Sequence, residues 1–446
     1  MSDYRKYWDE ERETMPLADR KRLIFSRLTE QLDYVYNSIP FYRRLYDQHG
    51  VKPHDIRYLE DFTEKIPVVT KDMLKASQAA HPPFGDYLGI DPAEIRQVMS
   101  TSGTTGQPTY LALSEDDWLH VGEATAMQCW AGGMRPDDIV QIGSPLAQFV
   151  GGWGVFCAAE TMGAKIVATG GTDSERQLLI MQQLGVTAFA STPSFFFHLK
   201  DVGDRVNFDF DSLCLKRGFF VGEPGAGIPE VKSLMQDQWG IKAIDFGNVA
   251  EVHPCSNMEC EERTGMHAWI DIDYTEIVDP EDPNSPIPMS ERGAVVYTHL
   301  WRRSQPMIRY YAGDETMMIE DPCACGRTYP RLPHGIIGRL DDMLIFRGVN
   351  VYPSAIERAL RATEGVGLEF RVFVEKVGPF DEARIEVEYD LKSFGENPAS
   401  TNLLTLSEDI RAKLSSIVGI RFPVDVVAPG TFAPSTGKAR RIIRAD

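Results

Sequence analysis

Residues 100–109 gather small polar side chains at a density that could bind an anion. They read Ser-Thr-Ser-Gly-Thr-Thr-Gly-Gln-Pro-Thr and follow Val98 and Met99, an apolar pair typical of a strand. Glycines let the backbone approach a phosphate closely, and its N–H groups and the hydroxyls supply neutral hydrogen-bond donors. The loop therefore predicts phosphate binding, although a Ser/Thr/Gly surface turn has the same composition. The candidate donors are Ser102, Gly103, Thr104, Thr105 and Gly106.

This loop lacks the pattern of the P-loop NTPases. In their motif, four residues separate the first glycine from a closing Gly-Lys-Ser/Thr, whereas Gly106 is followed by Gln107. The Gly437–Lys438 pair has Phe432 where that first glycine would be required. A P-loop NTPase is therefore disfavoured.

Five later segments place charged and turn-forming residues after apparent strands or near the end of the chain. They are Val221-Gly-Glu-Pro224, Asp245-Phe-Gly-Asn-Val-Ala-Glu251, Arg309-Tyr-Tyr-Ala-Gly-Asp314, residues 338–353 and Pro434-Ser-Thr-Gly-Lys438. Together with the loop, and in the same order, they resemble the motifs of the acyl-adenylate-forming superfamily in its phenylacetate–CoA ligase family. The resemblance extends from about Tyr7 to the end of the chain. It implies a large N-terminal domain, 1–340, and a small mobile α+β domain, 341–446.

The family resemblance implies an AMP-forming acid–CoA ligase. Such an enzyme joins a carboxylic acid to ATP as acyl-AMP with release of pyrophosphate, and then forms acyl-CoA and AMP. Its partners would be the acid, ATP and CoA, and a homodimer is compatible with the resemblance. Two alternatives stay open: loading of a carrier protein, and a catalytically silent relative with a binding role. The joint presence of Glu251, Asp314, Arg339 and Lys438 argues against the silent relative.

The resemblance also assigns the nucleotide contacts. Phe246 would stack on adenine, and Asp314 would accept hydrogen bonds from both ribose hydroxyls, a task that suits two adjacent carboxylate oxygens. Arg339 would contact the ribose or a phosphate. Further ATP or AMP contacts would come from Gly222, Glu223, Pro224, Asp245 and Gly247.

Two residues would carry the chemistry of adenylation. Glu251 would hold Mg²⁺, which offsets the repulsion between the anionic acid and the triphosphate. Lys438 would stabilise the charge that develops as the carboxylate attacks the α-phosphate. Asp341 would lie at the hinge of the small domain and Gly348 along the pantetheine passage. Gln107 departs from the family, which usually has a lysine there, and is left out of the catalytic set.

The segment Phe149-Val-Gly-Gly-Trp-Gly154 stands where the family builds its acid pocket. Gly151 and Gly152 leave room for a flat ring, while Phe149 and Trp153 supply aromatic walls. The segment favours a ring-bearing acid such as phenylacetate, benzoate, anthranilate or a hydroxylated relative. A short aliphatic hydroxy acid stays open, and so does a helix start that merely packs into the core.

Four cysteines lie in polar, turn-rich segments, where a reducing cytosol favours a metal site over disulfides. We expect a structural Zn²⁺ held by four of five residues, with either His253 or Cys255 as the fourth ligand. Reduced free cysteines in loops are the alternative interpretation. The five candidates are His253, Cys255, Cys260, Cys323 and Cys325. Such a site would pin the loop after Glu251 against the loop after Asp314. His267 is a separate candidate for a pocket-facing residue, for which a core histidine at a strand end is the favoured interpretation.

Alternating elements must position these residues. Short β-rich runs at 139–142, 165–168, 188–190 and 218–221 alternate with helical stretches. This order predicts an α/β fold of layered sheets, largely parallel in its first part. After Thr264, period-two hydrophobicity at 268–278 and 293–298 predicts an antiparallel, barrel-like subdomain. A helix over 354–362, strands over 369–375 and 383–389, and a helix over 407–418 follow.

Composition limits the partners and the compartment. A net charge of −19 argues against nucleic acid, because phosphate binding at that scale needs concentrated positive charge. The first residues, MSDYRKYWDEERE, have no apolar run typical of a signal peptide. The longest apolar stretches fall well short of the roughly 20 residues of a membrane span. We therefore expect a cytoplasmic protein without a membrane partner.

Overall fold

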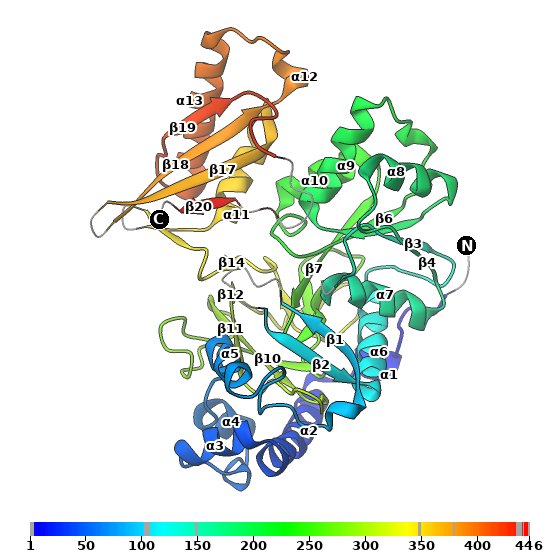
Figure 1. The fold of residues 1–446 in the computed structure, drawn as a ribbon, viewed down its shortest axis with the longest axis vertical. Helices are drawn as coiled ribbons and strands as arrows, with labels where there is room; N and C mark the ends of the chain where they lie inside the picture. Colours follow the sequence, from blue (N-terminus) through cyan, green and yellow to red (C-terminus); the bar gives the residue numbers. More distant parts are fainter. Residues whose placement is uncertain are drawn as a thin grey trace.

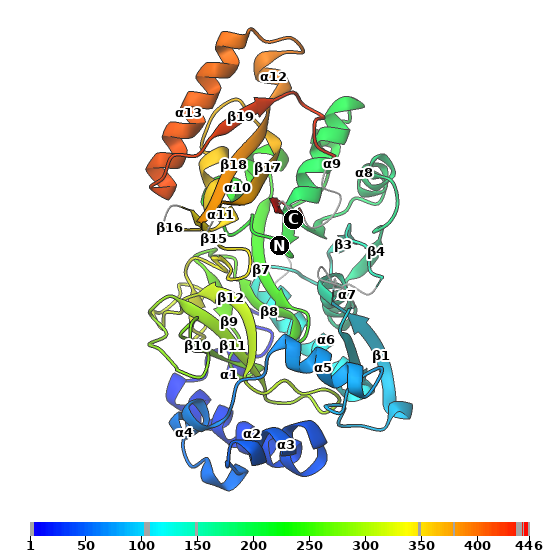
Figure 2. The same cartoon turned by 60° about the vertical axis from the view of Figure 1, so that its left-hand side comes forward.

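The structure is a computed structural model, and it describes residues 4–101, 108–147, 150–346, 349–377, 380–433, 439 and 441–444. Figures 1 and 2 show an elongated molecule with the N-terminal helices at one end and the C-terminal sheet at the other. Sheets of mixed type with helices packed on them confirm the expected α/β class. Among the described residues, no helix is both long and apolar enough to cross a membrane.

The largest sheet has the strand order β13-β9-β8-β7-β6-β5-β3-β4. Its parallel part contains the four strands expected from the sequence. Alternate residues of these strands face two different cores, so both faces are buried, as parallel sheets require. The strands are β3 (Ile139–Ile142), β4 (Lys165–Ala168), β5 (Ala188–Ser191), β6 (Arg217–Phe220), β7 (Lys242–Val249), β8 (His253–Glu259), β9 (Met266–Ala268) and β13 (Arg331–Leu332).

Five helices cover this sheet. One face packs against α6 and α7, and the opposite face against α8, α9 and α10. The helices are α6 (Glu115–Ala131), α7 (Val150–Met162), α8 (Ser174–Gln183), α9 (Pro193–Arg205) and α10 (Pro229–Trp239). A two-stranded hairpin, β1 (Ile95–Ser100) with β2 (Tyr110–Ser114), precedes α6.

The antiparallel subdomain expected after Thr264 is confirmed as a sheet of order β10-β11-β12-β14. The run 268–278 is not one strand, because residues 269–272 form a turn between β9 and β10. The strands are β10 (Asp273–Val278), β11 (Gly293–His299), β12 (Tyr310–Thr316) and β14 (Gly338–Arg339). The N-terminal helices are α1 (Glu10–Glu13), α2 (Leu17–Ser38), α3 (Pro40–Gln48), α4 (Leu59–Lys65) and α5 (Lys71–Ala80).

The C-terminal residues form a sheet with its own core, which extends from Leu344 to Val424. The strands and helices expected there are confirmed: the helix predicted over 354–362 begins and ends one residue earlier, and the other three predicted elements are longer than the sequence indicated. The elements are β15 (Leu344–Phe346), β16 (Val349–Val351), α11 (Pro353–Arg361), β17 (Val366–Val377), β18 (Phe380–Tyr389), α12 (Leu391–Phe394), α13 (Ser400–Val418), β19 (Val424–Val427) and β20 (Ile442–Arg444). A domain boundary between residues 340 and 341 stays a prediction.

Candidate active site

The predicted phosphate loop is closed at its base by the β1–β2 hairpin. The N–H of Thr101 donates to the carbonyl of Thr109 (3.1 Å), and the N–H of Thr109 donates to the Thr101 hydroxyl (3.1 Å). Gln107 and the five candidate donors lie outside the described residues. These donors are Ser102, Gly103, Thr104, Thr105 and Gly106. Their role stays a prediction.

Glu251 lies in the connection between β7 and β8, with its side chain 5% exposed. The ammonium of Lys71 lies 3.0 Å from its Oε1 atom, and the Tyr310 hydroxyl is a further hydrogen-bond partner. Lys71 is the first residue of α5, and Val69 just before it pairs with Tyr310 of β12. Sequence reasoning missed Lys71 and Tyr310 as site residues, because no local pattern brings α5 to the β7–β8 connection.

Asp314 and Arg339 are cross-strand partners in β12 and β14. Two guanidinium nitrogens of Arg339 lie 2.8 and 3.1 Å from the carboxylate of Asp341, and a third lies 3.2 Å from Asp314. These carboxylates raise the pKa of Arg339. The structure thus joins Asp314, the predicted ribose ligand, Arg339, the predicted contact to ribose or phosphate, and Asp341, the predicted hinge, in one ion-pair network.

The predicted adenine-side turn follows β6. Gly222 has a φ of +96°, which a side chain would strain, so the turn favours glycine there. The Glu223 carboxylate accepts hydrogen bonds from the N–H groups of Ser194 (2.7 Å) and Ala439 (2.6 Å), and its burial raises its pKa. Lys438 lies outside the described residues, but its neighbour Ala439 contacts this turn.

Asp245 and Phe246 are neighbours in β7, so their side chains point to opposite faces of the sheet. Burial, with Glu259 nearby, raises the pKa of Asp245 to about 7. Phe246 is 2% exposed and belongs to the core beneath α6 and α7, while Gly247 pairs with Asn257 of β8. The predicted stacking of Phe246 on adenine stays a prediction.

The first turn of α7 carries the predicted acid pocket. Gly151 is buried, and a Cβ on Gly152 would lie 3.3 Å from Leu146. The Trp153 ring makes edge contacts with Trp118 (6.0 Å between centroids) and Phe156 (5.4 Å). Phe149 lies outside the described residues, as does Gly348 of the predicted pantetheine passage. The described residues therefore supply an aromatic wall at the start of a helix.

The predicted zinc ligand set needs a correction. Cys260, Cys323 and Cys325 do lie together, but the fourth member is His267, with all four ligand atoms within 4.8 Å of one another. His253 and Cys255 are not part of this group. Strand β8 carries both of them away from Cys260, because an extended chain advances about 3.3 Å per residue.

The register of the β8–β9 hairpin explains why His267 takes this place. Met258 pairs with His267, and Glu259 pairs with Met266, so His267 returns beside the end of β8 where Cys260 follows. His253 instead forms hydrogen bonds through Nδ1 with the backbone of Cys255, and burial lowers its pKa to about 3. The interpretation of His267 as a core histidine missed this, since the register is not readable from the residues alone.

Comparison with known proteins gives matches over almost the whole chain. Residues 49–243 match the family model of the AMP-binding enzymes, and residues 348–445 that of the AMP-binding enzyme C-terminal domain. The phenylacetate–coenzyme A ligase of Thermus thermophilus is 33% identical, over 97% of this chain and 98% of that protein.

The structure resembles that of a 2-hydroxyisobutyryl-CoA ligase in two states. In its postadenylation state, in complex with R3-HIB-AMP, the TM-score is 0.94 at 38% identity, covering 100% of this chain and 94% of that one. In the thioesterification state, in complex with 2-HIB-AMP and CoA, the TM-score is 0.75 at 39% identity, covering 100% and 93%.

Proposed function

The chain belongs to the phenylacetate–coenzyme A ligase family, and we propose that it is an ATP-dependent acid–CoA ligase. A carboxylate oxygen of the acid attacks the α-phosphorus of ATP, the bond to pyrophosphate breaks, and acyl-AMP forms. The sulfur of CoA then attacks the acyl carbon, its proton is lost, and AMP leaves. The main support for this proposal is the structural similarity of the whole chain to a ligase in complex with an acyl-AMP, at a TM-score of 0.94.

We assign Mg²⁺ to Glu251. A buried carboxylate offers the hard oxygen that this ion prefers, and its ion-pair partner is the ammonium of Lys71, which ends a flexible four-carbon side chain. When bound, the ion would offset the repulsion between the acid and the triphosphate. Glu251 itself would orient the nucleotide from the β7–β8 connection.

We assign Lys71 to the triphosphate. The family usually places a lysine in the phosphate loop, and this chain has Gln107 there. The side chain of Lys71 is 41% exposed and ends at Glu251, so it can turn toward phosphates that arrive at this carboxylate. Lys71 would thus replace the charge that the loop lacks.

The Lys71→Ala variant is expected to raise the KM for ATP about tenfold, the effect of roughly 1.4 kcal/mol of lost charge contact. Initial rates of pyrophosphate release at varied ATP measure it. Lys65→Ala is the matched control, because Lys65 pairs with Asp61 on the surface of α4. An unchanged KM for ATP in Lys71→Ala would contradict the assignment.

We propose a small aromatic acid as the substrate. An aromatic cluster of Trp118 from α6 with Trp153 and Phe156 from α7 supports a flat ring as the ligand, since edge contacts between aromatic rings are favourable. The relatives named as phenylacetate–coenzyme A ligases support the same class.

A panel of acids tests the substrate class. With CoA present, pyrophosphate release is expected to be faster by at least about tenfold for phenylacetate, benzoate or anthranilate than for 2-hydroxyisobutyrate. The reverse order would contradict the aromatic class. Replacing CoA with a phosphopantetheinyl protein should abolish thioester formation; transfer to that protein alone would favour a carrier-loading enzyme.

We further propose that residues 341–446 turn as one body between the half-reactions. The gap between the two TM-scores, 0.94 and 0.75, supports an orientation like that of the postadenylation state. Three contacts go with this orientation: Arg358 with Glu230 (3.0 Å), Lys392 with Asp204 (2.7 Å) and Ala439 with Glu223 (2.6 Å). All three would break on rotation.

A further inference from the structure

We propose that Cys260, His267, Cys323 and Cys325 bind one Zn²⁺ ion, and that this ion fastens the N-terminal segment, residues 7–20, to the large domain. The inference goes beyond the proposed function, because no step of the ligation uses these residues. All four ligand side chains are buried, and they come from two separate parts of the chain.

The distances between the ligand atoms match a tetrahedral zinc site. Zn–S bonds of about 2.3 Å place two sulfurs about 3.8 Å apart, and a Zn–N bond of about 2.0 Å gives an S···N edge of about 3.5 Å. The Sγ atoms of Cys260 and Cys323 are 3.8 Å apart, and Sγ of Cys325 lies 3.3 Å from Nε2 of His267. A disulfide would need sulfurs at about 2.05 Å, so these thiols are spaced for a shared ion.

The backbone around the ligands has the features of a metal turn. The N–H of Arg327 points to Sγ of Cys325 (3.4 Å), and the N–H of Gly326 donates to the carbonyl of Cys323 (2.9 Å). Nδ1 of His267 faces the carbonyl of Tyr329 (3.4 Å), which leaves Nε2 for the ion. Three cysteines and one histidine are a common ligand set for structural zinc.

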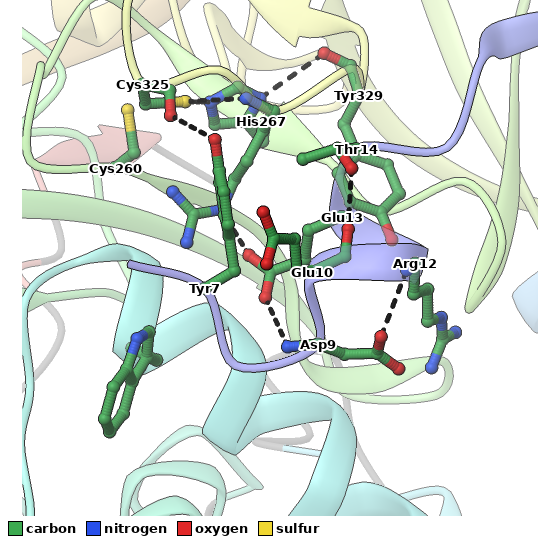
Figure 3. Close-up of polar contacts among 12 residues, drawn as sticks. Tyr7, Asp9, Glu10, Arg12, Glu13, Thr14, Cys260, His267, Cys325 and Tyr329 are labelled. Carbon is green, nitrogen blue, oxygen red and sulfur yellow. Dashed lines mark hydrogen bonds and ion pairs between the residues drawn. The ribbon is translucent and has the colours of Figure 1, made fainter. Parts of the chain in front are cut away.

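The N-terminal segment rests on this turn, as Figure 3 shows. The Tyr7 hydroxyl donates to the carbonyl of Cys325 (3.2 Å), and a Cβ on Gly326 would lie 2.3 Å from that hydroxyl. Gly326 also has a φ of +84°, which a side chain would strain. Both the close contact and the backbone conformation therefore favour glycine at this position. The ligand loop and the segment therefore touch directly.

A buried ion pair, a main-chain hydrogen bond and a cation–π contact complete the attachment. The carboxylate of Glu13 pairs with Arg327, two residues after a ligand, with both side chains almost fully buried. The N–H of Thr328 donates to the carbonyl of Glu13 (3.1 Å), and Arg20 stacks on Tyr329 at 3.7 Å. Without the ion, the loop of residues 327–329 would no longer be held in place. The N-terminal segment would then lose the surface on which it packs.

Metal analysis of the purified chain, prepared without chelator, tests the site. We expect about one zinc per chain in the wild type, and less than about a tenth of that in Cys323→Ser. Cys214→Ser is the matched control at an exposed cysteine, and Cys255→Ala tests the residue that the sequence alone suggested. Both controls should keep their zinc. A wild type without stoichiometric zinc, or loss of zinc in Cys255→Ala and not in Cys323→Ser, would overturn the proposal.

Limited trypsin digestion tests whether the ion fastens the N-terminal segment. It uses the wild-type protein, so the result does not depend on whether a variant folds. Zinc is removed from the wild type with a mercurial reagent and restored after the mercurial is displaced with excess thiol. Cleavage at Arg12 or Arg20, which lie within the segment, should speed up at least about tenfold after removal and return to its original rate on restoration. Equal rates in both forms would overturn the role in fastening while leaving the metal analysis to stand. Because neither readout involves turnover, failure here and failure of the ligase proposal are distinguishable.

Discussion

Replacing Lys438 with alanine is expected to slow acyl-AMP formation about 10²- to 10³-fold, the typical cost of removing one group that stabilises charge in a transition state. The lysine would meet the oxygens of the α-phosphate as negative charge shifts there. Pyrophosphate exchange measures this half-reaction separately from thioester formation.

The second half-reaction provides the internal control. Thioester formation from added acyl-AMP and CoA should change less than about threefold in Lys438→Ala, because this lysine would act on ATP and not on the thioester. Lys413→Ala, which removes an equal charge from α13, should leave both rates unchanged. Undiminished adenylation in Lys438→Ala would refute the proposed mechanism.

The second large effect is expected at Glu251. Glu251→Gln keeps the shape of the side chain but removes the charge that would hold Mg²⁺. Adenylation should fall by about 10²-fold, equivalent to roughly 3 kcal/mol, and the Mg²⁺ concentration for half-maximal rate should rise. Steady-state rates across a Mg²⁺ titration measure both changes.

Two comparisons sharpen the assignment of Glu251. Glu60→Gln removes a carboxylate from the surface of α4 and should match the wild type. The double variant Lys71→Ala with Glu251→Gln should show less than additive loss, because the two side chains are in contact. An unaltered Mg²⁺ requirement in Glu251→Gln would rule out this residue as a metal ligand.

Much of the fold was readable from the sequence because its signals are local. The strands β3 and β4 have the predicted bounds, and a proline in the sequence, Pro40, marks the point where α2 has ended and α3 begins. A buried parallel strand is a short apolar run, and proline cannot continue a helix hydrogen-bond pattern, so both signals lie within a few residues. The prediction of a single strand over 268–278 was wrong, because side chains on both sides of the chain are buried there. A buried apolar run of this kind does not distinguish a strand from a turn.

The sequence by itself determined the family, because six motifs in a fixed order are each carried by contiguous residues. Tertiary structure alone decided which side chains meet across the chain. It placed Lys71 on Glu251 by laying Val69 beside Tyr310, and it replaced His253 and Cys255 with His267 in the metal cluster. The physical reason is the same in both cases: strand pairing sets which distant residues become neighbours, and a pairing register is a property of two segments that neither one encodes alone.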